Sequence, residues 1–238
     1  MLDDDEVSRV LMITAHPDDV DFGAAGTIAA WTAAGREVAY CVVTDGDAGG
    51  FDPAVARSEI PAIRRAEQAA AAKTVGVSDL TFLGYHDGRV EVTIDLRRDL
   101  SRVIRRFRPQ RVVCQSPQRS WDRIYASHPD HLAAGEAATC AVYPDARNPF
   151  AHPELALEGW EAWTVPEMWL MAHPQANTWV DITDTLDRKV AALLCHESQM
   201  TEPSAIEERM RAWAASMAAA GGLAEGRLAE GFLRVDTA

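Results

Sequence analysis

Three continuous apolar runs constrain the fold of this chain most strongly, because a strand formed by each run can be buried on both faces. They lie at residues 10–15 (VLMITA), 38–44 (VAYCVVT) and 111–115 (RVVCQ). Apolar runs without regular polar alternation are typical of strands inside a parallel sheet, which have no face in contact with water. Helical segments separate the runs, and strand–helix alternation indicates right-handed crossovers within one sheet. The predicted fold class is therefore α/β with a mostly parallel sheet.

The remaining elements follow from hydrophobic periodicity and from the positions of glycine and proline. We expect helices at residues 24–34, 59–75, 96–107, 130–142, 186–196 and 205–219, and further strands at residues 80–83, 164–171, 178–182 and 232–235. The alternation weakens after residue 145, which predicts a smaller C-terminal β/α portion. With 238 residues and no repeat or linker, we expect one domain over 1–238, a Rossmann-like three-layer sandwich. Its core would be 1–145, with a variable substrate-side and C-terminal portion at 146–238.

Charge and cysteine usage narrow the expected partners and compartment. The formal net charge is −13, which argues against nucleic acid or an anionic membrane as a partner. The acidic start MLDDDEV differs from a signal peptide, and no apolar run reaches the roughly 18 residues of a membrane span. Four widely spaced cysteines without a CxxC pair predict reduced thiols in a cytoplasmic protein. The oligomeric state, including a homo-oligomer, stays open.

Two short motifs hold most of the residues with catalytic potential. AHPDDVDFG, at residues 15–23, follows the first predicted strand, and HPDH, at residues 128–131, ends the loop after the strand at 111–115. Both loops leave the carboxyl ends of their strands, so they are expected at the same edge of a parallel sheet. Ligands of open α/β sheets bind at this edge.

The side chains of these motifs fit a catalytic zinc site. Zinc binds imidazole nitrogen and carboxylate oxygen, and a catalytic site keeps three protein ligands and one position open for water. HPDD would supply His16 with either Asp18 or Asp19, and HPDH would supply His128 or His131. One Asp and one His then remain as a general base and an oxyanion stabiliser or acid. The spacing alone leaves open which Asp binds the metal.

Each motif taken alone also has a purely structural explanation. HPDH suits a helix N-terminus, since Pro129 fits the first helical position and Asp130 complements the helix dipole. HPDD suits a strand-to-helix turn that an Asp caps. Both motifs together, on loops that meet at one edge, favour the metal site.

The same residues carry a family resemblance that covers most of the chain. AHPDDVDFGAAGTIA followed by HPDH resembles the PIG-L/LmbE-like zinc-dependent N-deacetylases, which act on acetylated amino sugars. Four more segments are similar to the family: RRAEQAAAAKTVGV at 64–77, FLGYHDG at 82–88, KVAALLCHESQ at 189–199 and AEGFLRV at 229–235. One departure is Val20, followed by Asp21, where many members have Glu.

The resemblance implies separate roles for the two adjacent carboxylates. It makes His16, Asp19 and His131 the ligands of one Zn²⁺ per chain. It makes Asp18 the general base on the water that the metal activates. It places His128 near the developing oxyanion or the leaving nitrogen.

Three further residues are candidate substrate contacts. Arg64 occupies the position of a family arginine that can face substrate, although a solvated helix charge is the alternative. Asp87 is expected to bond sugar hydroxyls, or else to form only an Asp-Gly turn. Tyr125 lies three residues before His128, whereas some relatives have a catalytic Tyr two residues before that histidine.

The predicted function is zinc-dependent removal of an N-acetyl group from an amino sugar or glycosylated small molecule. An amidase that cleaves a larger N-acyl group, of the thiol-conjugate type, is the alternative within hydrolases. A nucleotide-binding Rossmann protein is less favoured, because the first strand–helix turn lacks G-x-G-x-x-G.

Overall fold

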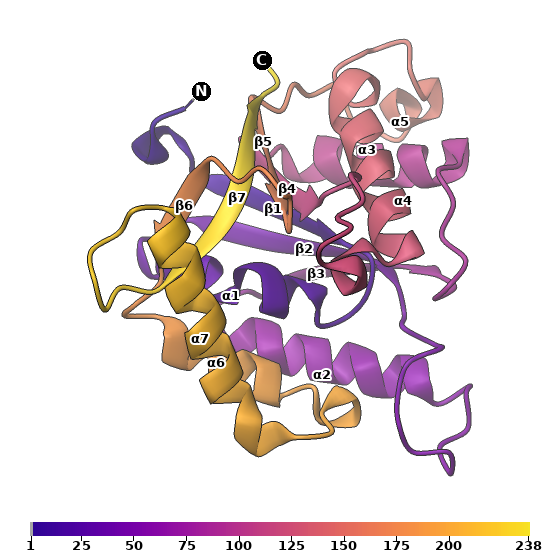
Figure 1. Cartoon of the computed structure of the whole chain (residues 1–238). Helices are drawn as coiled ribbons and strands as arrows, with labels where there is room; N and C mark the ends of the chain where they lie inside the picture. The colour runs from indigo at the N-terminus through magenta and orange to yellow at the C-terminus, as the bar shows by residue number, and fades with distance from the viewer. Residues whose placement is uncertain (1) are drawn as a thin grey trace.

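The computed structural model describes residues 2–238 and contains a seven-stranded sheet with helices on both faces (Figure 1). The strands are β1 (Arg9–Thr14), β2 (Glu37–Thr44), β3 (Asp79–Tyr85), β4 (Arg111–Gln115), β5 (Glu167–Met171), β6 (Thr178–Asp181) and β7 (Ala229–Asp236). Their order across the sheet is β3-β2-β1-β4-β5-β7-β6. The first five strands are parallel, and β7 is antiparallel to both β5 and β6. The predicted mostly parallel sheet is confirmed.

The helices form two outer layers. They are α1 (Asp19–Ala33), α2 (Ile60–Thr74), α3 (Ile94–Phe107), α4 (Pro129–Cys140), α5 (Pro153–Leu157), α6 (Leu186–Leu194) and α7 (Ile206–Ala220). Leu11 and Ile13 of β1 face the core shared with α3 and α4, whereas Val10 and Met12 face the core shared with α1 and α2. This alternation buries β1 on both faces, and it confirms the three-layer sandwich.

The helices differ from the sequence expectation in two ways: one begins earlier than expected, and one short helix was not expected. Helix α1 begins at Asp19 instead of residue 24, because Asp18 adopts a left-handed conformation and its carbonyl accepts from the N–H groups of Asp21 and Phe22. The helix therefore starts inside the segment at residues 15–23, which we expected to be a loop. The short helix α5 was not expected, since its five residues are too few to show a helical period.

The sheet topology explains where the HPDD and HPDH motifs meet in space. Strand β1 lies between β2 and β4, so the chain leaves β1 toward one side and returns to β4 on the other. This reversal opens a crevice beyond the carboxyl ends of β1 and β4, which is the usual ligand site of such sheets. The HPDD loop leaves β1 and the HPDH motif follows β4, so both lie at this crevice.

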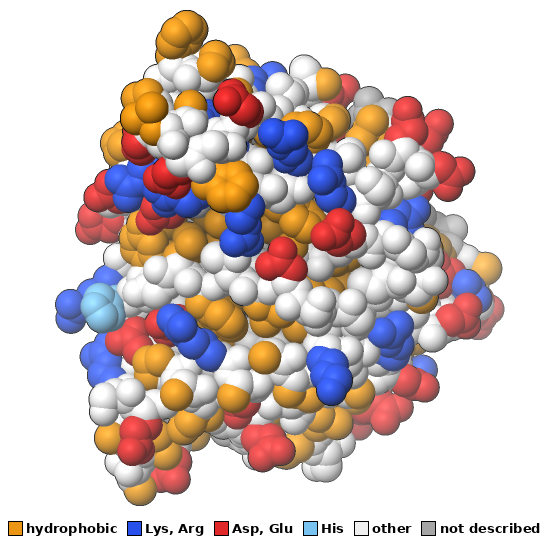
Figure 2. Space-filling view, turned by 180° about the vertical axis from the view of Figure 1, so that it is seen from behind, with side chains coloured by type: hydrophobic (Ala, Val, Ile, Leu, Met, Phe, Trp, Pro, Cys, Tyr) orange, Lys and Arg blue, Asp and Glu red, His pale blue; other side chains and the backbone are white. Residues whose placement is uncertain are grey.

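The surface opposite to the view of Figure 1 carries Lys and Arg interspersed with Asp and Glu (Figure 2). On this face, charges of one sign do not form a continuous strip. Within residues 2–238, no helix combines the length and the apolar character that crossing a bilayer requires.

Candidate metal centre and active site

Three imidazoles converge at the crevice between the ends of β1 and β4. The ring centroids of His16, His128 and His131 lie 5.0, 5.2 and 5.4 Å apart. One nitrogen of each ring lies within 4.8 Å of the others, which is close enough to share a cation. His16 leaves the end of β1, and Pro129 at the start of α4 sets the two other histidines on the first turn of that helix.

Asp19 connects two of these imidazoles through its two carboxylate oxygens. Its Oδ2 lies 3.3 Å from His16 Nδ1, and its Oδ1 lies 3.0 Å from His131 Nε2. Ligand atoms bound at about 2.0–2.2 Å to a tetrahedral zinc ion lie roughly 3.4 Å apart, so these separations match neighbouring ligands. Although burial favours the neutral acid, His131 and His16 hold the pKa of Asp19 well below its usual range. The nitrogen and oxygen donors present therefore fit a divalent cation such as zinc.

The other ring nitrogen of His16 faces two more carboxylates. His16 Nε2 lies 3.1 Å from Asp87 Oδ1 and 3.1 Å from Asp130 Oδ2. Asp130 is fully buried and also accepts from the backbone N–H groups of Gly88 at 2.7 Å and Val90 at 3.2 Å. This bonding fixes the His16 ring, in the way that second carboxylates orient metal-binding histidines.

The electrostatics of this cluster favour binding of a cation. Burial lowers the pKa of His16, but the carboxylates of Asp19, Asp130 and Asp87 outweigh burial and raise that pKa to about 12. A protonated imidazole thus supplies the positive charge that the carboxylates require. A metal ion can supply the same charge while the imidazole binds it in the neutral form.

Asp18 points its carboxylate at Arg64 beside this cluster. Asp18 has φ 91°, and its Oδ2 accepts from Arg64 Nη2 at 3.1 Å. Burial and the charge of Asp19 raise the pKa of Asp18 to about 6, against the opposing charge of Arg64. A carboxylate with a pKa near neutrality is suited to take up and return a proton.

His128 is held in one tautomer by the backbone of its own helix. Its Nδ1 accepts from the Asp130 backbone N–H at 3.2 Å, so the neutral ring carries its proton on Nε2. Burial lowers the pKa of His128, and the charges of His16 and His131 lower it further. A neutral imidazole with an Nε2 proton can donate to an oxyanion or protonate a leaving amine.

Comparisons with known proteins identify the family. The family model described as PIG-L, GlcNAc-PI de-N-acetylase, matches residues 11–142, more than half of the 238-residue chain. The chain belongs to the PIG-L family.

Named PIG-L relatives resemble the chain well beyond the motifs. Diacetylchitobiose deacetylase of Thermococcus kodakarensis is 33% identical over 201 residues, which cover 83% of this chain and 72% of that protein. A probable N-acetyl-alpha-D-glucosaminyl L-malate deacetylase 2 of Bacillus cereus is 32% identical over 198 residues, or 80% of this chain and 83% of the relative.

A solved structure gives the same result in three dimensions. N,N'-diacetylchitobiose deacetylase from Pyrococcus horikoshii, complexed with its inhibitor MPG, superposes with a TM-score of 0.89 at 29% identity. The match covers 98% of this chain and 85% of that chain. The predictions of the family and of an N-deacetylase, a hydrolase of amide bonds, are confirmed.

The three predicted substrate contacts of this PIG-L protein lie in different surroundings. Arg64 is only 3% exposed, so the alternative of a solvated helix charge is wrong. Asp87 reaches His16, as described above, and therefore does more than form a turn. Tyr125 lies on the surface with 73% of its area exposed, and its Oη accepts from Arg123 Nε at 3.1 Å.

Two residues in contact with the centre were not singled out from the sequence. The sequence indicates only a helix-dipole role for Asp130, although its place inside HPDH is a signal that it lies close to His16. Gln68 is fully buried, and its Oε1 accepts from the Asp18 backbone N–H at 2.8 Å. Nothing in the helical pattern of residues 59–75 distinguishes this glutamine from its neighbours, so only the structure could find it.

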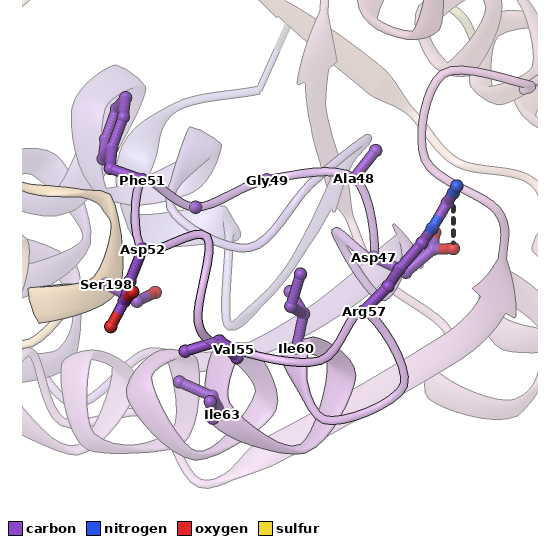
Figure 3. A pocket seen from close by; sticks show the side chains of 11 residues that line it. Asp47, Ala48, Gly49, Phe51, Asp52, Val55, Arg57, Ile60, Ile63 and Ser198 are labelled. Atoms are coloured by element: carbon purple, nitrogen blue, oxygen red, sulfur yellow. Dashed lines mark hydrogen bonds and ion pairs between the residues drawn. The ribbon is translucent and has the colours of Figure 1, made fainter.

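A separate cavity of about 360 Å³ lies under the loop between β2 and α2 (Figure 3). Its walls include Phe51, Val55, Ile60 and Ile63, and the Phe51 side chain points away from α2. None of the three clustered histidines lines this cavity. Asp47 connects the loop to the centre, because its Oδ1 accepts from the Asp87 backbone N–H at 2.8 Å.

Proposed function

We propose that this protein is a zinc-dependent N-deacetylase that removes the acetyl group from an amino sugar or a glycosylated small molecule. One observation carries the proposal: the carboxylate oxygens of Asp19 lie 3.3 Å from His16 Nδ1 and 3.0 Å from His131 Nε2, separations that neighbouring ligands of one zinc ion have. Asp18, the preceding residue, supplies a second carboxylate that is not needed as a ligand. The named relatives support the substrate class, since their names give diacetylchitobiose and N-acetyl-alpha-D-glucosaminyl L-malate as the compounds that they deacetylate.

His16, Asp19 and His131 would hold one zinc ion per chain. When bound, zinc lowers the pKa of a water molecule to near neutrality and polarises a carbonyl oxygen. Asp87 and Asp130 keep the His16 ring in the orientation that leaves Nδ1 facing Asp19.

Asp18 acts as the general base. Its carboxylate takes a proton from the attacking water as the new C–O bond forms at the acetyl carbon. His128 donates from Nε2 to the developing oxyanion. The C–N bond then breaks, and Asp18 or His128 delivers the proton that the leaving amine requires, so that acetate and a free amino sugar are released.

We also propose where the substrate and the protein reside. Asp87 and Tyr125 would contact the sugar portion of the substrate. Arg64 is 3% exposed and donates to the Pro17 carbonyl and to Asp18, so we assign it to the site through Asp18 and not through a direct sugar contact. The four free cysteines support a cytoplasmic location, where thiols stay reduced.

Acetate release tests the reaction. Purified protein with zinc should release acetate and expose an amine on N-acetylglucosamine, diacetylchitobiose or a small N-acetylglucosaminide. Asp18→Asn should bind zinc as the wild type does and lose at least about 100-fold in kcat, within the range for a general base. Full turnover by Asp18→Asn would contradict the base assignment. Release of a longer acid, with no acetate, would favour the larger-acyl amidase.

A further inference from the structure

Behind Asp18 lies a chain of buried polar side chains that the proposed reaction does not use directly. Gln68 Oε1 accepts from the Asp18 backbone N–H at 2.8 Å, and Gln68 Nε2 donates to Asp21 Oδ2 at 2.8 Å. His196 Nε2 lies 2.8 Å from the same Asp21 oxygen. Gln68, Asp21 and His196 each have 0% exposure. Within the described residues, Asp21 Oδ1 and His196 Nδ1 are buried without a hydrogen-bond partner. Both hydrogen bonds of the Gln68 amide are made, so Gln68 is the member of the chain that restrains Asp18 directly.

The direction of these hydrogen bonds is determined by chemistry. A backbone N–H can only donate, so Gln68 must present its oxygen to Asp18. The amide NH₂ group of Gln68 then faces Asp21 and, being only a donor, donates to Asp21 Oδ2. Burial lowers the pKa of His196, but its hydrogen bond to Asp21 and the charge of Asp21 outweigh burial and raise that pKa, which favours donation from Nε2.

The bond to Gln68 is one half of a clamp on a single peptide unit. The Pro17 carbonyl accepts from Arg64 Nη2 at 2.6 Å, and the N–H of that same peptide, on Asp18, donates to Gln68. Arg64 and Gln68 are four residues apart on α2 and therefore lie on one face of the helix. Both ends of the Pro17–Asp18 peptide are thus held by adjacent turns of α2.

The clamped peptide precedes a residue in an unfavourable conformation. Asp18 has φ 91°, and a left-handed conformation costs a residue other than glycine roughly 1–3 kcal/mol. Such a conformation persists only where surrounding contacts determine it. The orientation of the Pro17–Asp18 peptide sets this φ, and with it the direction in which the Asp18 carboxylate points.

The C-terminal segment at 196–199 supports the clamp from behind. His196 bonds Asp21, and Ser198 donates to Glu67 from both its backbone N–H and its Oγ, each at 2.7 Å. Glu67 is the neighbour of Gln68, so this segment fixes the turn of α2 that carries the clamp. The HESQ part of KVAALLCHESQ thereby gains a physical role.

We propose that Gln68, supported by Asp21 and His196, is a positioning residue that holds the Pro17–Asp18 peptide and so aims the Asp18 carboxylate at the reacting water. This inference rests on the proposed role of Asp18 as the base. It goes beyond that role because it gives a function to the buried chain of Gln68, Asp21 and His196 and to the segment at 196–199, namely to orient the Asp18 carboxylate.

Gln68→Met tests the inference, since methionine keeps the length of the side chain and removes both hydrogen bonds. We expect kcat to fall about 10- to 100-fold, the range seen when residues that orient a site are replaced. KM should stay within about twofold, and the variant should bind one zinc per chain. Gln110→Met is the matched control, because Gln110 Oε1 also accepts from a backbone N–H, that of Arg9 at 2.8 Å, at the opposite end of the sheet. This control should keep the wild-type kcat.

A double-mutant cycle with Asp18→Asn separates positioning from a general structural effect. If Gln68 acts through Asp18, adding Gln68→Met to Asp18→Asn should leave the residual rate unchanged within about twofold. An equal loss in both backgrounds would overturn the inference. A Gln68→Met enzyme with wild-type kcat, beside an inactive Asp18→Asn enzyme, would overturn it as well and leave the proposed function intact.

A second variant covers the case in which Gln68→Met does not fold. His196→Gln acts on the far end of the chain and should also lower kcat, by at least about threefold, with zinc content and KM retained. Unchanged kcat in folded His196→Gln would show that this end of the chain does not support the clamp and would overturn that part of the inference.

Discussion

At the scale of single residues, Asp130 shows how one carboxylate can fix a metal ligand. It accepts from three donors: His16 Nε2 and Gly88 N–H on Oδ2, and Val90 N–H on Oδ1. In Asp130→Asn one acceptor oxygen becomes an NH₂ group, so at least one buried N–H would face another donor. We expect a loss of about 1–3 kcal/mol in the free energy of unfolding and zinc affinity weakened about 10- to 100-fold.

Equilibrium denaturation and zinc titration measure these two effects. Asp122→Asn, on the exposed loop before HPDH, is the control and should change neither. Wild-type zinc affinity in Asp130→Asn would show that the His16 ring is held by other contacts.

The clustering of the motif histidines could be predicted from the sequence, because each motif is short and directly follows a predicted strand. The loops after two parallel strands had to reach the same edge, so the meeting of His16 with His128 and His131 followed from topology. The left-handed φ of Asp18 and its hydrogen bond to Gln68 were not predictable, since they depend on how α2 packs against a loop 50 residues away in the chain.

At the scale of elements, the position of α4 depends on one glycine. A Cβ on Gly135 would lie 2.3 Å from the Gln115 carbonyl oxygen at the end of β4. Gly135→Ala improves helix propensity by about 1 kcal/mol, yet the new methyl group must push α4 away from the strand. We expect a net destabilisation of about 1–3 kcal/mol, together with a fall in kcat because His131 lies on the first turn of α4.

Urea denaturation and steady-state kinetics check this expectation. Glu136→Ala, at the exposed next position of the same helix, is the control and should stay within about 0.5 kcal/mol of the wild type. A Gly135→Ala protein more stable than the wild type would contradict the close packing of α4 on β4.

Most helices and strands were predictable to within a few residues, because their hydrophobic periods are clear. Strand β4, for example, has the bounds that the RVVCQ run predicted. The order of the last strands was not predictable: β7 lies between β5 and β6, and a short apolar segment such as residues 232–235 contains no signal for its neighbours.

At the scale of the whole molecule, the histidine and aspartate cluster of the active site and a buried ion-pair network lie at opposite ends of the sheet. Arg111 and Glu167 are fully buried, with Nε 2.5 Å from Oε1, and the guanidinium carbon of Arg111 lies 4.0 Å from the ring centroid of Trp169. Arg234 bonds the second oxygen of Glu167 at 2.7 Å. Glu167→Ala would remove the carboxylate that Arg111 and Arg234 share, and it would leave the buried Arg111 with only the exposed Asp4, 2.8 Å from its Nη2, as an ion-pair partner. We expect a loss of about 3–5 kcal/mol in stability, with kcat per folded molecule and zinc content unchanged.

Thermal unfolding, zinc analysis and kinetics at low temperature separate these effects. Glu207→Ala, which breaks the exposed Arg211–Glu207 pair on α7, should cost less than about 0.5 kcal/mol. Loss of zinc from folded Glu167→Ala would show that the two ends of the sheet are coupled.

The zinc content of the protein decides whether the crevice is a metal centre. It is measured by mass spectrometry after the protein has been reconstituted with zinc and freed of excess metal. The wild type should retain one zinc per chain, and His131→Ala should retain less than about a tenth of that amount. His173→Ala, the control at a histidine outside the cluster, should retain as much zinc as the wild type. A wild-type protein that retains no zinc, or a His131→Ala protein that retains one per chain, would contradict the assignment of His16, Asp19 and His131 as the ligands.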